Sequence, residues 1–201
     1  LTIFEFCYTL SGRFLSFMER EGVMRSIFFA VLCFAIYVGN LQAVRGETET
    51  NNDLRKWQKS AIELGIPRVL GTYRDDIQHA SEATNVPSDI IATVMVVESL
   101  GKKNALSKTG AKGLMQISRE IDGKMGIRCD AREPKCSIKK GAIYLSILAE
   151  RYQVGTWLHV MLAYRYGPEG ASRIENLEKD PYAKKALFVL KRLPEGAFAP
   201  S

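Results

Sequence analysis

The chain has 201 residues, a length that suits one compact domain and is short for two. Hydrophobic residues make up 46% of it and charged residues 25%, a balance that is typical of a globular protein and excludes a largely disordered one. The net charge of +6 favours a polyanionic partner such as cell wall or a membrane surface, although a generically basic, solvated surface would give the same count.

The first 43 residues have the pattern of a leader. An arginine precedes a 12-residue apolar core, and small residues follow up to Ala43. This predicts a secretory signal peptide over residues 24–43, because the apolar core is short for a membrane span. Residues 1–23 are then expected to be an upstream extension, with Met24 as the true start. We therefore expect an exported, periplasmic protein without a stable membrane anchor, and export argues against nucleic acid as a partner.

The domain is expected to begin with two helical segments. Residues 54–64 place Trp57 and further apolar residues near helical spacing, and Gly65 is expected to end this helix. Trp57 is interpreted as a core anchor. A second, less regular helical pattern covers residues 68–85.

The next segment, residues 90–97, is apolar at every position except Thr93. Its isoleucine and valine content favours a buried strand locally. The preceding Pro-Ser-Asp is a helix-start signal, with Ser88 as the cap and Asp89 as an acid in the first turn. Because the span up to Leu100 is also long for a strand, we predict a helix.

Four further segments complete the chain. Residues 113–118 can make a short helical turn, and residues 156–166 are apolar almost throughout, which indicates a central helix. Asp180 and the proline after it begin a helix over residues 180–193. Residues 137–153 predict an amphipathic helix. Its expected buried face contains Ile138, Ala142, Leu145, Ile147, Leu148 and Tyr152.

These patterns predict a mainly α protein with one domain of packed helices. The domain is expected over residues 54–193, after a polar leader at 44–53 and before a tail at 194–201. No convincing strand pattern or internal repeat is found elsewhere.

Two cysteines remain after the leader, Cys129 and Cys136, in the sequence CDAREPKC. In an exported chain this spacing favours a disulfide that closes a small loop. Metal binding is the weaker interpretation, because the chain has only two histidines, His79 and His159, and each stands alone. We predict neither a metal nor a cofactor.

Glu98 follows the apolar segment directly, and a loop rich in glycine, lysine and serine comes after it. A carboxyl at the C-terminal end of an apolar helix is desolvated and faces the negative end of the helix dipole, so its pKa is expected to rise. A proton held near neutral pH is what a general acid needs. The alternative is that Glu98 marks the exposed end of the helix, and position alone favours that alternative.

The order of the surrounding residues changes this balance. Glu98 and Ser99 are followed by SKTGAKGLMQI at residues 107–117 and by AYRYGP at 163–168. These three elements, in this order, resemble the soluble lytic transglycosylase (SLT) domain of the lysozyme-like superfamily. The family pattern is a Glu-Ser pair, an S-x-x-G-A-x-G-L-M-Q run and a later A-Y-N-A-G-P. The resemblance covers roughly residues 85–175 and implies a lysozyme-like domain with a sugar-binding groove.

The resemblance also implies an activity and a set of site residues. Glu98 would be the catalytic acid and then base in cleaving the β-1,4 bond between N-acetylmuramic acid and N-acetylglucosamine of peptidoglycan, leaving a 1,6-anhydro end. The sugar's own acetamido group assists, so a second catalytic carboxylate is not required, and Glu120 and Asp122 are expected to be surface charges. Ser107, Gln116 and Tyr164 would bind substrate, with Gly110, Gly113 and Met115 in the supporting loop.

Two positions depart from the family pattern. Ser118 follows the GLMQI run where the family often has methionine and proline, and Arg165 and Tyr166 replace the asparagine and alanine of the last motif. Arg165 is a candidate for binding a substrate carboxylate or for pointing into solvent. The variable Cys129–Cys136 loop is expected to flank the groove.

Two rival functions stay open at this stage. A muramidase-type hydrolase on the same fold would need an activated water, and a non-catalytic wall-binding assembly protein would keep the fold without the reaction. Peptidoglycan glycan strands are the expected partner in each case. The small size also suggests, by family analogy alone, an association with an envelope machine for secretion, conjugation or pilus assembly.

Overall fold

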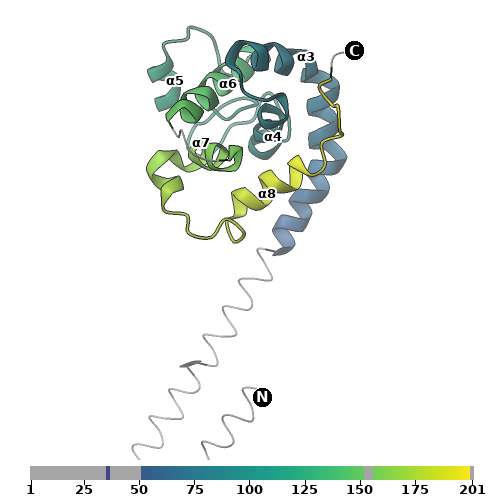
Figure 1. Ribbon diagram of the computed structural model, residues 1–201, viewed down its shortest axis with the longest axis vertical. Coiled ribbons are helices and arrows are strands. Elements are labelled where there is room, and N and C mark those ends of the chain that lie inside the picture. The colour runs from purple at the N-terminus through teal and green to yellow at the C-terminus, as the bar shows by residue number, and fades with distance from the viewer. Residues whose placement is uncertain (1–34, 37–50, 152–155, 200–201) are drawn as a thin grey trace, which may run out of the picture. The chain divides into compact units, whose positions relative to one another are not determined.

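A computed structural model describes residues 35–36, 51–151 and 156–199 of the chain. The chain divides into two units, residues 1–52 and 53–201, and the fold below belongs to the second. The predicted extension and signal peptide lie outside the described residues except at positions 35–36. The described part is mainly helical and contains isolated β-bridges instead of strands, which confirms the predicted fold class (Figure 1). None of the described helices combines the length and apolarity needed to cross a membrane.

The first two predicted helices are continuous. Residues 53–60 are helical, a π-helical turn η1 (Ala61–Gly65) follows, and α3 (Ile66–Thr84) continues directly from it. The prediction that Gly65 ends the helix is wrong, because this glycine serves a close contact. A Cβ at Gly65 would lie 3.1 Å from the Leu100 side chain and 3.2 Å from that of Val96. Pro67 has no N–H to donate, so one helical hydrogen bond is missing at this point. The wider π turn in front of Pro67 accommodates the missing bond.

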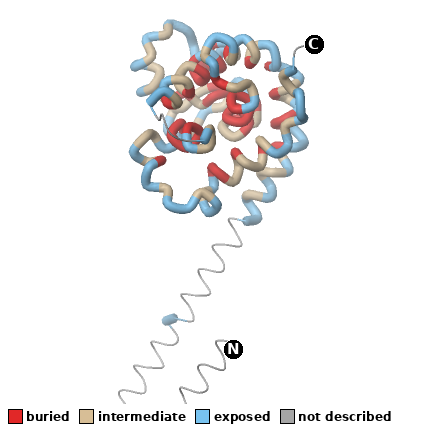
Figure 2. Tube along the Cα trace, in the orientation of Figure 1, coloured by how far each residue is buried: buried red, intermediate tan, exposed pale blue. Residues whose placement is uncertain are grey.

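Helix α4 (Ser88–Ser99) is the centre of the domain, and every residue from Ile90 to Val96 is buried (Figure 2). It packs against α3 and α8 (Pro181–Leu190). The helix prediction for this segment is confirmed, but the cap is one residue earlier than expected. Pro87 is the N-cap, with its carbonyl accepting from the amides of Ile90 and Ile91, while Asp89 accepts from the Ile90 amide through its side chain.

The remaining predicted helices are α6 (Pro134–Arg151), α7 (Trp157–Ser172) and α8, all confirmed by the structure. Asp180 caps α8 as predicted, because its carboxylate accepts from the Ala183 amide at 2.7 Å. The expected buried face of α6 is wrong at one position, since Ile147 is 46% exposed. Tyr152 lies outside the described residues.

Two segments near the predicted site differ from expectation. Residues 113–116 form a tight turn closed by paired backbone hydrogen bonds between Lys112 and Ile117, and they are not helical as predicted. A short helix α5 (Arg119–Met125), which the sequence patterns did not indicate, follows at once. The Ser118 hydroxyl caps it by accepting from the Ile121 amide at 3.2 Å.

Candidate active site

A cavity of about 570 Å³ opens at the C-terminal end of α4. Its walls come from five parts of the chain. They are represented by Glu98 of α4, Gln116 of the tight turn, Ile121 of α5, Tyr144 of α6 and Tyr164 of α7. The structure therefore brings three of the residues predicted from the sequence, Glu98, Gln116 and Tyr164, to one cavity.

Glu98 is half-buried and faces this cavity from the last turn of α4. Burial raises the pKa of its carboxyl above the ordinary value, because the charged form loses hydration. The positive charge of Arg165, the hydroxyl of Tyr182 and the positive charge of Lys185 act in the opposite direction and lower the pKa in part. The carboxyl is thus held in its protonated form more strongly than a surface glutamate, with two cations nearby to stabilise the anion once the proton leaves.

Tyr182 is the site residue that the sequence patterns missed. It is buried on α8 with its hydroxyl near Glu98, where each group affects the pKa of the other. Among the described residues this buried hydroxyl has no hydrogen-bond partner at ordinary distance. The sequence gives no local signal that Tyr182 belongs to the site. Its helix has the pattern of an ordinary core helix, and Tyr182 is far from Glu98 along the chain.

The tight turn that carries Gln116 is held by side chains from three helices. Ser99 Oγ, from the residue next to Glu98, has one hydrogen to donate and lies 2.8 Å from the carbonyl oxygen of Leu114 and 3.1 Å from that of Met95. On the far side of the turn, the Met115 amide donates to Ser137 Oγ at 3.1 Å and the Met115 carbonyl accepts from Tyr164 Oη at 2.7 Å.

The two glycines of this loop serve different purposes. Gly113 has φ +76°, and a Cβ there would lie 1.8 Å from the carbonyl oxygen of Ala131, so its close approach is to the protein's own backbone rather than to a sugar. Gly110 has φ +86° with open space around it, so it supplies the left-handed turn conformation. Met115 is fully buried in the core under the site, with its side chain against Gly141.

Ser107 and Gln116 are held differently. Ser107 Oγ accepts from the Ala111 amide at 2.9 Å and contacts Thr109 Oγ1 at 3.0 Å, and Thr109 rather than Ser107 lines the cavity. Gln116 lines the cavity and donates through Nε2 to the carbonyls of Ala105 at 3.1 Å and Gly113 at 3.0 Å. Because both amide hydrogens are used in this way, the group that Gln116 can offer a ligand is its side-chain oxygen, an acceptor.

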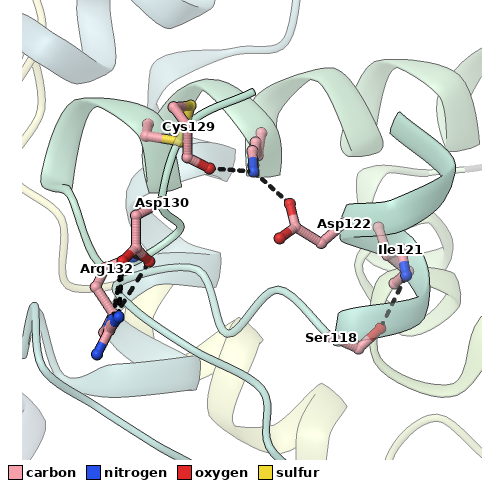
Figure 3. A network of polar contacts seen from close by, with 8 residues as sticks. Ser118, Ile121, Asp122, Cys129, Asp130 and Arg132 are labelled. Carbon is pink, nitrogen blue, oxygen red and sulfur yellow. Dashed lines mark hydrogen bonds and ion pairs between the residues drawn. A yellow bond between two sulfur atoms is a disulfide. The ribbon is translucent and has the colours of Figure 1, made fainter. Parts of the chain in front are cut away.

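The disulfide prediction is confirmed, since Cys129 and Cys136 are joined (Figure 3). The loop that it closes is tied to α5 through Lys140 of α6, which is only 1% exposed. Lys140 Nζ donates to the Cys129 carbonyl at 2.6 Å and to Asp122 Oδ1. The prediction that Asp122 is merely a surface charge is therefore wrong, because a buried lysine requires an ionic partner.

Glu120 on the same helix is exposed and pairs with Lys124 at 2.6 Å, as a surface charge would. Unlike Asp122 it faces the cavity. No group of three or more potential metal ligands occurs within the described ranges.

The profile of the "Transglycosylase SLT domain" family matches residues 75–187, which is more than half of the chain. The chain belongs to this family. The matched residues include those of the cavity walls and Tyr182. Through this family the chain belongs to the lysozyme-like superfamily that the sequence motifs indicated.

Individual relatives are similar over shorter stretches. The chain is 31% identical over 93 residues to membrane-bound lytic murein transglycosylase F 2 of Alkalilimnicola ehrlichii, covering 46% of this chain and 20% of that protein. It is 36% identical over 81 residues to endo-type membrane-bound lytic murein transglycosylase A of Salmonella paratyphi B, covering 35% and 40%. The chain thus spans less than half the length of these relatives. A solved structure of an inactive variant of lytic transglycosylase Slt from Pseudomonas aeruginosa aligns with TM-score 0.49 and 23% identity over 59% of this chain and 22% of that one.

This SLT-family chain departs from the usual last motif at Arg165 and Tyr166, and the structure gives each a place. Arg165 is exposed and lines the cavity beside Glu98. Tyr166 Oη donates to Asp180 Oδ2 at 3.0 Å, and its ring packs edge-on to Tyr182 at 6.2 Å. Gly167 then adopts the non-helical angles φ 72° and ψ 165°, which kink α7 at a point where Gly167 and Pro168 line the cavity. The unusual Tyr166 therefore ties α7 to the start of the helix that carries Tyr182.

Proposed function

We propose that this chain is a lytic transglycosylase that cleaves the β-1,4 bond between N-acetylmuramic acid and N-acetylglucosamine in peptidoglycan. The observation that carries the proposal is Glu98, a carboxyl with a raised pKa that lines a cavity large enough for sugar rings. Membership of the SLT family supports the reaction class.

In the first step Glu98 gives its proton to the glycosidic oxygen as the bond to the muramic anomeric carbon breaks. The acetamido carbonyl oxygen of the same sugar stabilises that carbon. The carboxylate left behind is stabilised by Arg165 and Lys185, the two charges that lower its pKa. In the second step this carboxylate removes the proton of the muramic 6-hydroxyl, whose oxygen bonds to the anomeric carbon. Glu98 is restored, no water is consumed, and the product has a 1,6-anhydro end.

The polar groups around the cavity fit this substrate. Gln116 offers an acceptor oxygen suited to an acetamido N–H or a sugar hydroxyl. Tyr164 lines the cavity and its hydroxyl donates to the Met115 carbonyl, so we assign it to holding the turn as well as the sugar. Ser107 shapes the loop through the Ala111 amide.

A hydrolase is the second candidate, and Glu120 is the observation in its favour. Glu120 lines the same cavity, and its pairing with Lys124 lowers its pKa, so it is ionised as a base for water would have to be. The two reactions differ in their products, because hydrolysis adds a water to the new end and transglycosylation does not.

Digestion of purified peptidoglycan by the protein, followed by mass spectrometry of the ends, tests the proposal. We expect anhydro ends, lighter by one water, from the protein and from a Glu120→Gln variant, and none from Glu98→Gln. Reducing ends that disappear in Glu120→Gln would establish the hydrolase instead. Retained wall binding without products from any of them would identify a non-catalytic binding protein.

The expected setting of this activity is the periplasm. The leader pattern at residues 24–43 and the Cys129–Cys136 disulfide support export. An association with a secretion, conjugation or pilus machine would suit a small enzyme that opens the wall locally. Crosslinking in cells followed by identification of co-purified envelope proteins tests it, and capture of no such protein would leave a general wall-remodelling enzyme.

A further inference from the structure

A second hollow, with a volume of about 350 Å³, lies where the beginning of the domain meets the end of α8. It shares no lining residue with the cavity at Glu98. The family profile matches residues 75–187, so every residue around this hollow lies outside the match. We call it the α8 hollow. The lining residues used below are Arg55, Lys59, Ile62 and Glu63 near the start of the domain, and Phe188 and Arg192 at the end of α8.

Aromatic contacts hold the walls of the α8 hollow together. The ring of Trp57 packs edge-on to that of Phe188 at 6.2 Å, so α8 lies beside the first helix (Figure 1). Lys185 Nζ lies 5.0 Å from the centre of the Trp57 ring, and the Arg192 guanidinium lies 3.9 Å from the centre of the Phe188 ring. Cation–π contacts of this kind stabilise long side chains in one place. The hollow is therefore built before a partner arrives, and little ordering remains to be done on binding.

The α8 hollow has apolar surface that the core does not use. Ile62 lies on the π turn η1, whose residues Ala61 and Gly65 are the ones that face the core, and it is 48% exposed. Phe188, which is half-buried, lines the hollow as well. Apolar side chains that line a hollow in this way indicate a ligand with an apolar group of its own.

The charges of the α8 hollow add a second requirement. Glu63 is its only lining carboxylate among the described residues, and it pairs with Lys59 at 3.8 Å. Arg55 and Arg192 remain, and within the described ranges neither has an ion-pair partner. Two arginines without carboxylate partners favour a ligand that brings carboxylates, because the guanidinium group pairs with them through two parallel hydrogen bonds.

We propose that the α8 hollow binds an acidic segment of a partner protein. An aliphatic or aromatic side chain of that segment would lie on Ile62 and Phe188, and its carboxylates would pair with Arg55 and Arg192. A bare glycan strand has no large apolar group to place there. A lipid surface would need apolar side chains on a projecting face, whereas these line a hollow.

Docking at the α8 hollow would leave the cavity at Glu98 open, because the two share no residue. A partner could then hold the protein at one place in the envelope while the cavity stays accessible to a glycan strand. The inference does not depend on the reaction proposed above, and it adds a docking site to it.

The test selects peptides from a random library displayed on phage, with the protein as the immobilised target. The selected peptides are synthesised with a fluorescent label, and their Kd is measured by fluorescence anisotropy. We expect them to carry carboxylates next to leucine or an aromatic residue. Ile62→Ser and Arg55→Gln should each weaken their binding at least about tenfold, as residues at the centre of an interface do. Both side chains are exposed, so Tm and the cleavage of peptidoglycan should stay unchanged in these variants.

Matched controls lie elsewhere on the chain. Ile147 is 46% exposed but lines the cavity at Glu98, and Arg173 is an exposed arginine that lines neither hollow, so Ile147→Ser and Arg173→Gln should bind the peptides normally. The inference is overturned if no peptide is enriched, if the enriched peptides lack carboxylates, or if Ile147→Ser weakens them as much as Ile62→Ser.

Other occupants of the α8 hollow give different results. The inference is also overturned if Ile62→Ser and Arg55→Gln abolish self-association in sedimentation, or binding to anionic vesicles or insoluble peptidoglycan, while no peptide depends on these residues. Failure of the protein to cleave peptidoglycan would refute the proposed function and leave this test as it stands.

Discussion

Replacing Tyr164 by phenylalanine removes one oxygen atom and leaves the ring, including its contact with Tyr144 at 5.2 Å. The lost hydroxyl is the one that donates to the Met115 carbonyl at 2.7 Å, in a place where both residues are buried. The change therefore leaves a buried carbonyl without this donor, while the volume of the core stays nearly the same.

The expected cost follows from that unpaired carbonyl. A buried polar group that loses its partner costs about 1–3 kcal/mol, more than the net value of the hydrogen bond itself. We therefore expect Tyr164→Phe to lower the free energy of unfolding by about 2 kcal/mol. For a domain of this size that corresponds to a fall in Tm of roughly 5 °C. Activity should fall as well, because the turn that it holds carries Gln116.

Tyr182→Phe is the matched control, because its buried hydroxyl has no partner of this kind within the described residues. Removing that hydroxyl should change stability by less than about 0.5 kcal/mol or raise it, since it leaves no main-chain carbonyl unpaired and takes from the nearby Glu98 only a group that lowers its pKa in part. Urea denaturation of both variants with a common m-value measures the difference. If the free energy of unfolding of Tyr164→Phe is unchanged, or if both variants lose the same amount, the assignment of Tyr164 to the turn is refuted.

Three further predictions concern the site and its surroundings. Burial raises the pKa of Glu98 in the folded chain, so its proton stabilises the fold below the ordinary carboxyl pKa, and this contribution is lost as pH rises through the raised value. Glu98→Gln should thus be more stable than the unaltered protein near pH 7, with a difference that disappears in acid; a constant difference in pH-dependent denaturation would contradict this. Gly113→Ala should cost about 4 kcal/mol or more, since its Cβ meets a backbone carbonyl at 1.8 Å, and a soluble variant with an unchanged Tm would exclude that. Reducing the Cys129–Cys136 disulfide should lower stability by about 2.5 kcal/mol by the loop-entropy relation and affect kcat less; an unchanged melting curve after reduction would count against it.

The sequence was informative wherever the cause of structure is local or periodic. The proline-serine-aspartate before residue 90 outweighed the strand-like composition of α4, and Asp180 capped α8 as its position suggested. The proposal that Glu98 is the catalytic acid came from the order of the motifs. It could not have been found from the apolar helix alone, because an exposed helix end has the same pattern.

The rest depends on contacts between distant parts of the chain. Gly65 has the sequence signal of a helix end, but the helix continues through it. A glycine is needed there because α4 passes too close for a side chain. Lys140 and Asp122 look like surface charges until the fold brings them together. Ile147 follows the helical period of a core residue, yet it faces a cavity, and Tyr182 is a site residue that reads as core.

The bonds that fasten the turn between α4 and α5 have a consequence for how such a site can change over evolutionary time. Ser99, Ser137 and Tyr164 all attach to main-chain atoms of Leu114 and Met115. These hydrogen bonds fix the backbone conformation of the turn. They do not depend on which side chains the turn carries. A neighbouring cavity-facing position can therefore change its residue type while the scaffold keeps its melting temperature. Such substitutions would show as differences in the glycans that related proteins bind.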